Sequence, residues 1–263
     1  MRRSILITGA GSGIGKDTAF ALARKGHEVY ATTETQTQRD QLQNEVDQKG
    51  LNISVFKLDI TDPLDREKIK ELNLDVLINN AAIGESGSLA DIPMDRVRKN
   101  FETNVFCTFE LSQIALEKML KKDKGTVIFI SSLAGKITMP FLGSYCMTKF
   151  ALSSGVDALR SEMRRITRKV HITLVEPGGY HTGFNQRNIS TKFEWMDENS
   201  PFYPILEKIQ KEDARNFRFT EVRSTNSIVN KIVKAAEASR PRFRYTAPWW
   251  QAFGVQVMRI FGK

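Results

Sequence analysis

The sequence predicts an α/β fold, a Rossmann-like doubly wound parallel sheet of about seven strands with helices on both faces. Three observations predict this fold class. Short β-rich runs alternate with helical patterns, residues 127–130 are apolar throughout, and a glycine cluster joins the first strand to the first helix. A strand that is apolar on both faces belongs inside a sheet that helices cover. Strand–helix alternation implies right-handed crossovers between parallel strands.

The expected elements follow this alternation along the chain. Strands are expected at residues 5–8, 28–33, 53–58, 75–78, 126–130 and 171–175, with a further candidate at 243–246. Helices are expected at residues 13–25, 39–49, 95–121, 143–165, 201–215 and 224–239. Residues 178–200 are expected to form a loop with helix fragments. No linker is recognisable, so we expect a single domain over residues 1–263, with a substrate loop and C-terminal elaboration from about residue 183.

The composition excludes several classes of protein. Hydrophobic residues make up 41% of the chain and charged residues 26%, which is too apolar for an intrinsically disordered chain. No run approaches the roughly 18 apolar residues of a membrane-spanning helix. The chain has two cysteines, so we expect a reducing compartment and a cytoplasmic location. Its cysteines and three histidines form no cluster with metal-site spacing, so no metal is expected.

The charge is unevenly distributed along the chain. Lys and Arg number 39 against 30 for Asp and Glu, which gives a net charge of +9. Residues 203–263 contain 12 basic and 5 acidic residues and so carry +7 of this excess. A basic chain attracts polyanions, but no nucleic-acid-binding motif accompanies the charge. We therefore expect a basic C-terminal subdomain and no nucleic-acid partner.

A glycine turn follows the first strand and opens the first helix. Its members are Gly9, Gly11, Ser12, Gly13, Ile14 and Gly15. Glycines allow a tight turn and a close approach of the backbone to a ligand. The helix N-terminus presents free N–H groups and its positive dipole end to a pyrophosphate. This strand–turn–helix context predicts a dinucleotide site, with a tight turn that binds no ligand as the alternative.

The glycine turn with the preceding Thr8 resembles the Thr-Gly-x-x-x-Gly-x-Gly fingerprint of the short-chain dehydrogenase/reductase family. The resemblance extends from residue 4 to about residue 182. Residues 79–82, Asn-Asn-Ala-Ala, resemble the family's Asn-Asn-Ala-Gly and differ only in the last position. The resemblance implies that Asn80 and Ala81 line the cofactor.

The resemblance also places the two ends of the cofactor's adenosine. Asp59, with the adjacent Ile60, follows the third strand, where this family contacts the adenine; a cap of the following turn is the alternative for Asp59. An acid at the end of the second strand bonds the ribose of NAD, whereas a nearby Arg accommodates the phosphate of NADP. Thr33 is not that acid, and Glu34 stands where NADP enzymes often have Arg. The expected cofactor is NAD(P), with NADP slightly favoured if Glu34 turns to solvent while Thr33, Thr32 and Arg39 serve the phosphate.

The resemblance implies a reacting group of four residues. Tyr145 and Lys149 lie four residues apart and share a helix face, and Ser132 follows a buried strand, where a doubly wound sheet places its site. A Lys ammonium favours a nearby phenolate, so the Tyr145 pKa is expected to fall. In the family's mechanism Ser132 holds the substrate oxygen, Tyr145 moves the proton, and Lys149 assists Tyr145 and binds ribose. Asn104 supports a proton-relaying water.

Each of these assignments has a plainer alternative. The Tyr–Lys pair alone fits a packed ring beside a solvated stem, and Asn104 alone fits an Asn that bonds its own helix. Ser131 is expected to form hydrogen bonds at the strand end. Residues 177–182 resemble the family's Pro-Gly-x-x-x-Thr, which implies that Pro177, Gly178 and Thr182 lie on the nicotinamide side. The alternative is an ordinary strand-ending turn. His181 is expected to be a loop or substrate-facing residue.

Two apolar stretches are expected to wall the substrate pocket, as they do in this family. They contain Met139, Phe141, Leu142, Phe184, Phe193, Trp195, Met196, Phe202 and Tyr203. They imply an apolar small molecule with one carbonyl or hydroxyl group, and ordinary core under a long loop is the alternative. Residues 248–261 are rich in aromatic residues and poor in charge. Such a helix could lie weakly on a membrane surface, cap the pocket, join a subunit interface or fold onto its own domain.

These features predict an NAD(P)-dependent oxidoreductase that transfers a hydride between the nicotinamide and a carbonyl or secondary alcohol. A non-catalytic dinucleotide-sensing or scaffold protein is the alternative from another class. The family resemblance suggests a homodimer or homotetramer, built partly from the helices at residues 95–121 and 143–165.

Overall fold

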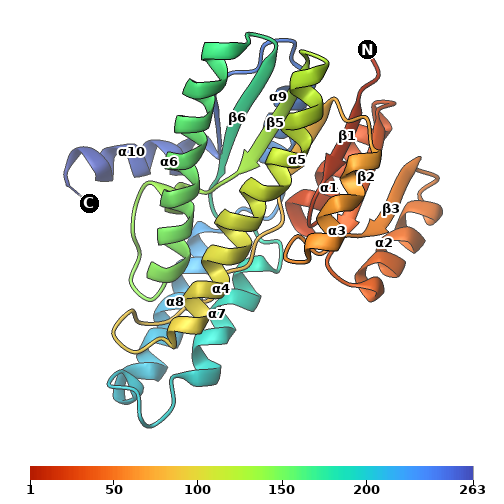
Figure 1. The fold of residues 1–263 in the computed structure, drawn as a ribbon. Coiled ribbons are helices and arrows are strands. Elements are labelled where there is room, and N and C mark those ends of the chain that lie inside the picture. The colour runs from red at the N-terminus through yellow and green to blue at the C-terminus, as the bar shows by residue number, and fades with distance from the viewer. Residues whose placement is uncertain (263) are drawn as a thin grey trace.

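The computed structural model describes residues 1–262, without the side chains of residues 188, 189 and 217. Seven strands form one parallel sheet in the order β3-β2-β1-β4-β5-β6-β7 (Figure 1). They are β1 (Ser4–Ile7), β2 (Glu28–Thr33), β3 (Ile53–Lys57), β4 (Val76–Asn79), β5 (Gly125–Ile130), β6 (Val170–Pro177) and β7 (Arg244–Ala247). The strand order reverses between β1 and β4, where such a sheet opens its ligand crevice. The predicted doubly wound fold is confirmed.

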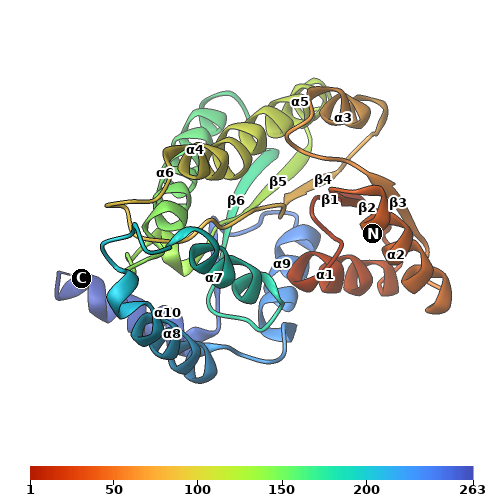
Figure 2. The same cartoon turned by 90° about the horizontal axis from the view of Figure 1, so that it is seen from below.

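Helices cover both faces of the sheet, as Figure 2 shows. One face carries α1 (Gly13–Arg24), α2 (Gln36–Gln48) and α9 (Asn226–Glu237). The other carries α3 (Pro63–Glu67), α5 (Cys107–Lys121) and α6 (Gly143–Ile166). Successive strand residues point to opposite faces, so Ile5 and Ile7 join the first core cluster and Leu6 joins the second. The strands that read as apolar on both faces therefore lie between two helical layers.

Local sequence explains where helix α2 begins. It starts three residues before the predicted residue 39, because Thr35 and Gln38 form a capping box. The Thr35 hydroxyl accepts a hydrogen bond from the Gln38 N–H at 3.2 Å, and the Gln38 side-chain oxygen accepts one from the Thr35 N–H at 3.4 Å. These polar residues carry no hydrophobic period, so the periodicity alone placed the start too late.

The helix expected over residues 95–121 is interrupted by a π-helical turn. Helix α4 (Met94–Phe101) passes into this turn, η2 (Glu102–Phe106), and then into α5. A π turn inserts one extra residue into a helix and is found most often at functional sites. Asn104, one of the four predicted reacting residues, lies in this turn.

Helices α4, α7 (Phe184–Trp195) and α8 (Leu206–Thr220) extend beyond the carboxyl edge of the sheet (Figure 1). The loop expected over residues 178–200 is thus largely helical, because polar side chains along α7 obscure its apolar period. Helix α8 begins and ends five residues later than predicted, after the 3-10 turn η4 (Tyr203–Ile205). Helix α10 (Trp249–Ile260) follows β7 and projects from the body. Two further 3-10 turns are η1 (Lys68–Glu71) and η3 (Leu133–Gly135).

Candidate active site

The predicted cofactor turn has a backbone that requires glycine. Gly9 and Gly13 have φ angles of +63° and +57°, a region that other residues rarely adopt. A Cβ atom on Gly9 would lie 2.7 Å from the Ala81 Cα, and one on Gly13 would lie 2.8 Å from the Thr182 Cβ. The turn is therefore pressed between the loops that follow β4 and β6. This contact brings together three of the predicted cofactor segments.

Two side chains fix the turn to the end of β4. The Thr8 hydroxyl accepts hydrogen bonds from the backbone N–H groups of Asn80 and Ala81, each at 3.0 Å. The Asn80 amide nitrogen donates to the carbonyls of Thr8 at 2.9 Å and Gly9 at 3.0 Å. Asn80 and Thr8 thus both support the backbone of the turn, a role that the sequence analysis did not assign to Thr8. The signal for Thr8 was its place at the head of the glycine fingerprint.

The start of α1 can hold an anion. Ser12 is the N-cap of this helix and forms no side-chain hydrogen bond to it. The first N–H groups of a helix have no partner within the helix, and in α1 they begin at Gly13, Ile14 and Gly15. The glycine positions around them leave the backbone open to a pyrophosphate. The residues present therefore fit the phosphates of a dinucleotide.

Asp59 caps the turn that follows β3. Its carboxylate accepts hydrogen bonds from the N–H and the hydroxyl of Thr61, at 2.8 and 2.7 Å. Its own N–H donates to Asp65 at 2.8 Å, which fixes the backbone that leads to the buried Ile60. The turn-cap alternative for Asp59 is thus present in the structure. The two hydrogen bonds to Thr61 engage one carboxylate oxygen, so the cap does not exclude an adenine contact.

The residues near the ribose position are mostly engaged in other contacts. The Thr33 hydroxyl donates to the Thr35 carbonyl at 3.1 Å, and the buried Thr32 hydroxyl donates to the Ile7 carbonyl at 3.4 Å. The Arg39 guanidinium donates to the Val55 carbonyl and pairs with Asp40 at 3.0 Å. Glu34 is exposed. A cofactor phosphate would therefore have to compete with existing partners for each of the residues predicted to bind it.

Helix α6 holds Tyr145 and Lys149 on one face, as their spacing predicted. The Lys149 amine is buried and donates to the Ile130 carbonyl at 3.1 Å. The amine lies 5.5 Å from the centre of the Tyr145 ring. Phe184 of α7 also packs on Tyr145, with the two ring centres 5.8 Å apart. The lysine is therefore not a solvated stem beside a packed ring.

The two serines after β5 have different partners. Ser131 is buried and bonds the Ser153 hydroxyl at 2.8 Å and the Lys149 carbonyl at 3.3 Å, so it ties the strand end to α6. The Ser132 hydroxyl accepts from the Ala134 N–H at 3.1 Å and donates to the Pro177 carbonyl at 3.4 Å. It also hydrogen-bonds the Tyr145 side chain. Of the two serines, Ser132 is therefore the one whose side chain interacts with Tyr145.

Burial controls the protonation of the Tyr–Lys pair. Burial raises the pKa of Tyr145 well above its usual range, and the hydrogen bond with Ser132 only partly opposes this. Burial also lowers the pKa of Lys149 to about 8. The Tyr145 pKa was expected to fall, and this expectation is wrong: the loss of solvent around the phenol raises the pKa and outweighs any effect of the nearby lysine. A lysine that releases its proton near pH 8 exerts less pull on the phenol than a permanent cation.

Asn104 belongs to a repeated pattern of hydrogen bonds. Its side chain accepts from the Ile83 N–H at 2.9 Å and donates to the Ile83 carbonyl at 2.8 Å and to Thr148 at 3.1 Å. Asn100, four residues earlier, bonds both backbone groups of residue 85 at 2.9 and 3.1 Å and the Ser144 hydroxyl at 2.6 Å. Asn104 therefore does not bond its own helix. The sequence signal for Asn100 was the same amide at helical spacing.

The loop after β6 meets α10 through one side chain. The Gly178 N–H donates to the Ala247 carbonyl at 2.8 Å, and the Gly179 N–H donates to the Gln251 side chain at 2.7 Å. Gln251 in turn donates to the Thr220 carbonyl at the end of α8, at 2.6 Å.

His181 is exposed and pairs with Glu221 at 2.8 Å. It is a loop residue, as expected.

The two predicted substrate walls touch each other. The rings of Phe141 and Phe202 pack edge to face, with centres 5.4 Å apart. The buried Lys192 amine lies 5.5 Å from the Phe141 ring centre and pairs with Asp213. These contacts place α7, α8 and the loop before α6 around the reacting residues.

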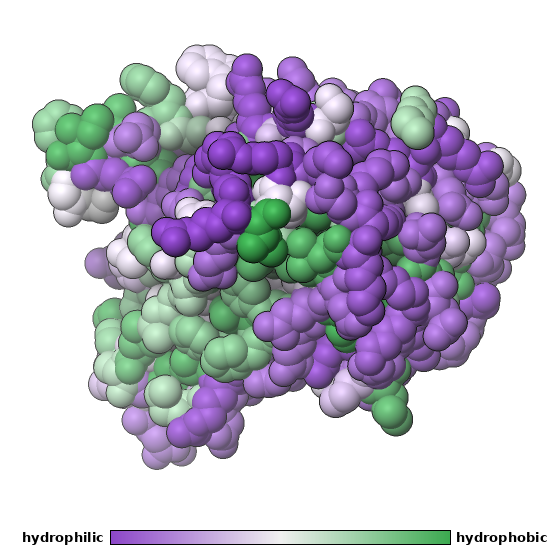
Figure 3. Space-filling view, turned by 45° about the horizontal axis from the view of Figure 1, so that its top comes forward, coloured by the Kyte–Doolittle hydropathy of each residue, from purple (hydrophilic) through white to green (hydrophobic). Residues whose placement is uncertain are grey.

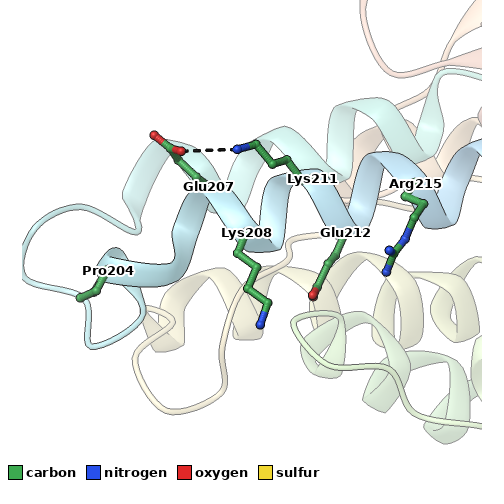
Figure 4. A pocket seen from close by; sticks show the side chains of 6 residues that line it. All are labelled: Pro204, Glu207, Lys208, Lys211, Glu212 and Arg215. Carbon is green, nitrogen blue, oxygen red and sulfur yellow. Dashed lines mark ion pairs between the residues drawn. The ribbon is translucent and has the colours of Figure 1, made fainter.

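Two surface grooves lie outside the candidate site. One, of about 600 Å³, lies along α8 (Figure 4) and is lined by Pro204, Glu207, Lys208, Lys211, Glu212 and Arg215. The other, of about 380 Å³, lies beside the first residues of the chain. Both carry charges of both signs at the surface. Neither contains a predicted site residue.

The comparison with protein families decides the assignment. Residues 3–192 match the model of the short chain dehydrogenase family. The chain belongs to the short-chain dehydrogenase/reductase family. It is 33% identical to the 3-ketodihydrosphingosine reductase of Bacteroides thetaiotaomicron, over 98% of this chain and 90% of that protein. Membership makes the chain an oxidoreductase of this family.

Solved structures show the same fold. The short chain dehydrogenase/reductase of Burkholderia phymatum, crystallised in complex with NAD, matches with a TM-score of 0.82 and 20% identity, covering 97% of this chain and 92% of that one. The short-chain dehydrogenase of Sphingobium yanoikuyae, in complex with NADPH, matches with a TM-score of 0.73 and 19% identity, covering 99% and 96%. Both likenesses extend over the sheet and the C-terminal helices of this short-chain dehydrogenase/reductase.

Proposed function

We propose that this chain binds NAD(P) and transfers a hydride between its nicotinamide and a carbonyl or secondary alcohol of an apolar substrate. The observation that carries the proposal is the convergence of Ser132, Tyr145 and Lys149 beside the glycine turn. Asn104 is joined to the same group through Thr148. A packing framework alone does not require an acid, a base and an anion-binding turn at one edge.

The cofactor supplies the hydride chemistry when it is bound. The backbone of the glycine turn and the start of α1 hold its phosphates, and Thr182 lies against Gly13 on the nicotinamide side. Asp59 and Ile60 lie at the adenine side. NADP is favoured over NAD, because Thr33 offers no carboxylate to a ribose hydroxyl and the exposed Glu34 is free to turn into solvent.

The protein residues hold the substrate oxygen and move its proton. The Ser132 and Tyr145 hydroxyls, which lie close enough to interact, would both donate to a carbonyl oxygen placed between them, with Ser132 giving up its bond to the Pro177 carbonyl. Tyr145 gives its proton to the developing alkoxide. Lys149 returns a proton to the site, because its pKa of about 8 allows it to exchange one near neutral pH. Asn104 holds the backbone of Ile83 beside α6, where a water can connect Lys149 to solvent.

The substrate is proposed to be a long apolar molecule with one reacting oxygen. Phe184 packs against Tyr145, and Phe141 and Phe202 pack on each other in the two stretches expected to wall the pocket. The related protein from Bacteroides thetaiotaomicron is named for the reduction of a ketone on a sphingoid base. We propose a substrate of the same chemical class for this chain, an aliphatic ketone with a long tail. We further propose that the protein acts in the cytoplasm as a homodimer or homotetramer.

The test uses the change of Tyr145 to Phe. Tyr145→Phe keeps the ring that packs on Phe184 and removes the transferable proton, so kcat should fall by about 10²- to 10⁴-fold. NADPH affinity should be nearly unchanged. Rates are measured with NADPH and aliphatic ketones of increasing chain length. Full activity in the variant would refute the role of Tyr145, and NADPH binding without turnover of any ketone in the wild type would favour the sensing or scaffold alternative.

A further inference from the structure

Helix α10 presents its apolar side to solvent. Trp249, Phe253 and Ile260 are exposed by 77%, 66% and 72%, and their spacing places them on one helix face. A surface helix of a globular protein normally turns such a face toward the core. Figure 3 shows the result as an apolar protrusion on one side of the molecule. The hydrophobic face of α10 therefore does not pack against the core of the protein.

The orientation of α10 is fixed by its other side. Val255 is buried, and Gln251 joins the helix to the Gly179 N–H and to the Thr220 carbonyl at the end of α8. Phe219, next to Thr220, is 75% exposed. The outward face is therefore held in place by hydrogen bonds at the first turn of the helix, and a further aromatic ring lies on the segment to which it is tied.

Positive charge accompanies this apolar face. Residues 203–263 carry a net charge of +7. Exposed cations stand on α10 itself, at Arg259, and on the segments around Thr220, at Arg218 and Arg223. Aromatic side chains with neighbouring cations are the composition of helices that bind the interface of anionic membranes. No helix among residues 1–262 is long and apolar enough to cross a membrane.

We infer that α10 docks this protein onto an anionic lipid surface. Trp249, Phe253 and Ile260 enter the boundary between headgroups and acyl chains, while the arginines contact lipid phosphates. A second copy of the chain fits this face less well. The helix is about 18 Å long, so its outward face alone falls well short of the ~800 Å² per partner of a stable dimer.

The test is sedimentation of the full chain with vesicles of phosphatidylglycerol and phosphatidylcholine, compared with phosphatidylcholine alone. The anionic vesicles should bind the protein, and added salt should weaken binding because exposed charges are screened. The double variant Trp249→Ser, Phe253→Ser should weaken partitioning by about tenfold or more, since each ring loses its apolar burial. Arg259→Glu should weaken it several-fold. Leu64→Ser, at a 79% exposed position on α3, is the matched control and should change nothing.

Three results would overturn the inference. The first is no binding of the wild type to anionic vesicles. The second is equal binding by the wild type and the double variant. The third is a wild-type oligomer that the double variant dissociates, without vesicle binding, which would assign the face to a second copy. NADPH binding by the double variant confirms that it is folded, so failure of this inference is distinguishable from failure of the proposed enzymatic function.

Discussion

Helices α9 and α10 lie on either side of β7 in the chain and have the same length, yet they are built in opposite ways. Helix α9 buries Ile228, Ile232 and Val233 against the sheet, and its lysines face solvent. Helix α10 buries Val255 and exposes Trp249 and Phe253. Hydrophobic periodicity predicted both helices. It identifies an apolar face but not what that face contacts, which depends on how the rest of the chain covers the sheet.

The same contrast separates the two sides of the active-site edge. On the side of β1 and β4, the half-buried Asn80 and the buried Asn104 bond backbone groups of other segments. On the side after β6, the loop is held to α10 by the half-buried Gln251. We propose that the first side is a framework for the cofactor and the proton transfer. The second side carries the exposed apolar face of α10.

The largest expected effect compares one residue from each helix. Ile232→Ala in α9 should lower the free energy of unfolding by about 2–5 kcal/mol, because it leaves a cavity in the core. Phe253→Ala in α10 should change it by less than about 0.5 kcal/mol, because the ring is already in water. Urea unfolding measures both. If Phe253→Ala lowered the free energy of unfolding nearly as much as Ile232→Ala, the contrast between the two helices would be wrong, and other residues would cover the outward face of α10.

The next effect separates framework from chemistry within the buried side. Asn100 and Asn104 make matching contacts with the backbone and with a hydroxyl of α6. Asn100→Ala and Asn104→Ala should therefore destabilise by similar amounts, about 1–3 kcal/mol. Only Asn104→Ala should also lower kcat, by about tenfold or more. Equal kcat in the two variants would mean that Asn104 supports the structure and takes no part in the reaction.

The smallest effect is a pH dependence from Lys149. Its pKa is about 8 in the folded chain, against an ordinary value of 10.5. Between these values the unfolded state binds more protons, so stability should rise from pH 8 to 9.5. Lys149→Met should remove this rise. Measurements stay below pH 10, because at higher pH the raised Tyr145 pKa would make stability fall instead of rise. If stability changed with pH in the same way in the wild type and in Lys149→Met, Lys149 would not be buried.

The sequence predicted the sheet and the glycine turn because each follows from local pattern, whereas the candidate reacting residues came from the family resemblance. Tyr145 and Lys149 share a face by spacing alone, and the strands are marked by apolar runs. The Gln251 contact with Gly179 joins residues 72 apart and has no periodic signal. The Tyr145 pKa was also beyond the sequence, since it depends on how completely α7 shields the ring. Helix fragments were expected in residues 178–200, but the bounds of α7 were not, because its polar residues hide the apolar period.

The most direct test of the account is a titration of the purified chain with NADPH and NADH, followed by energy transfer from tryptophan to the nicotinamide. The account predicts saturable binding, tighter for NADPH, that is lost in Gly13→Val. That variant would force a side chain against Thr182 at a position with a φ of +57°. Binding of neither nucleotide would contradict the account, because the glycine turn would then be only a structural turn.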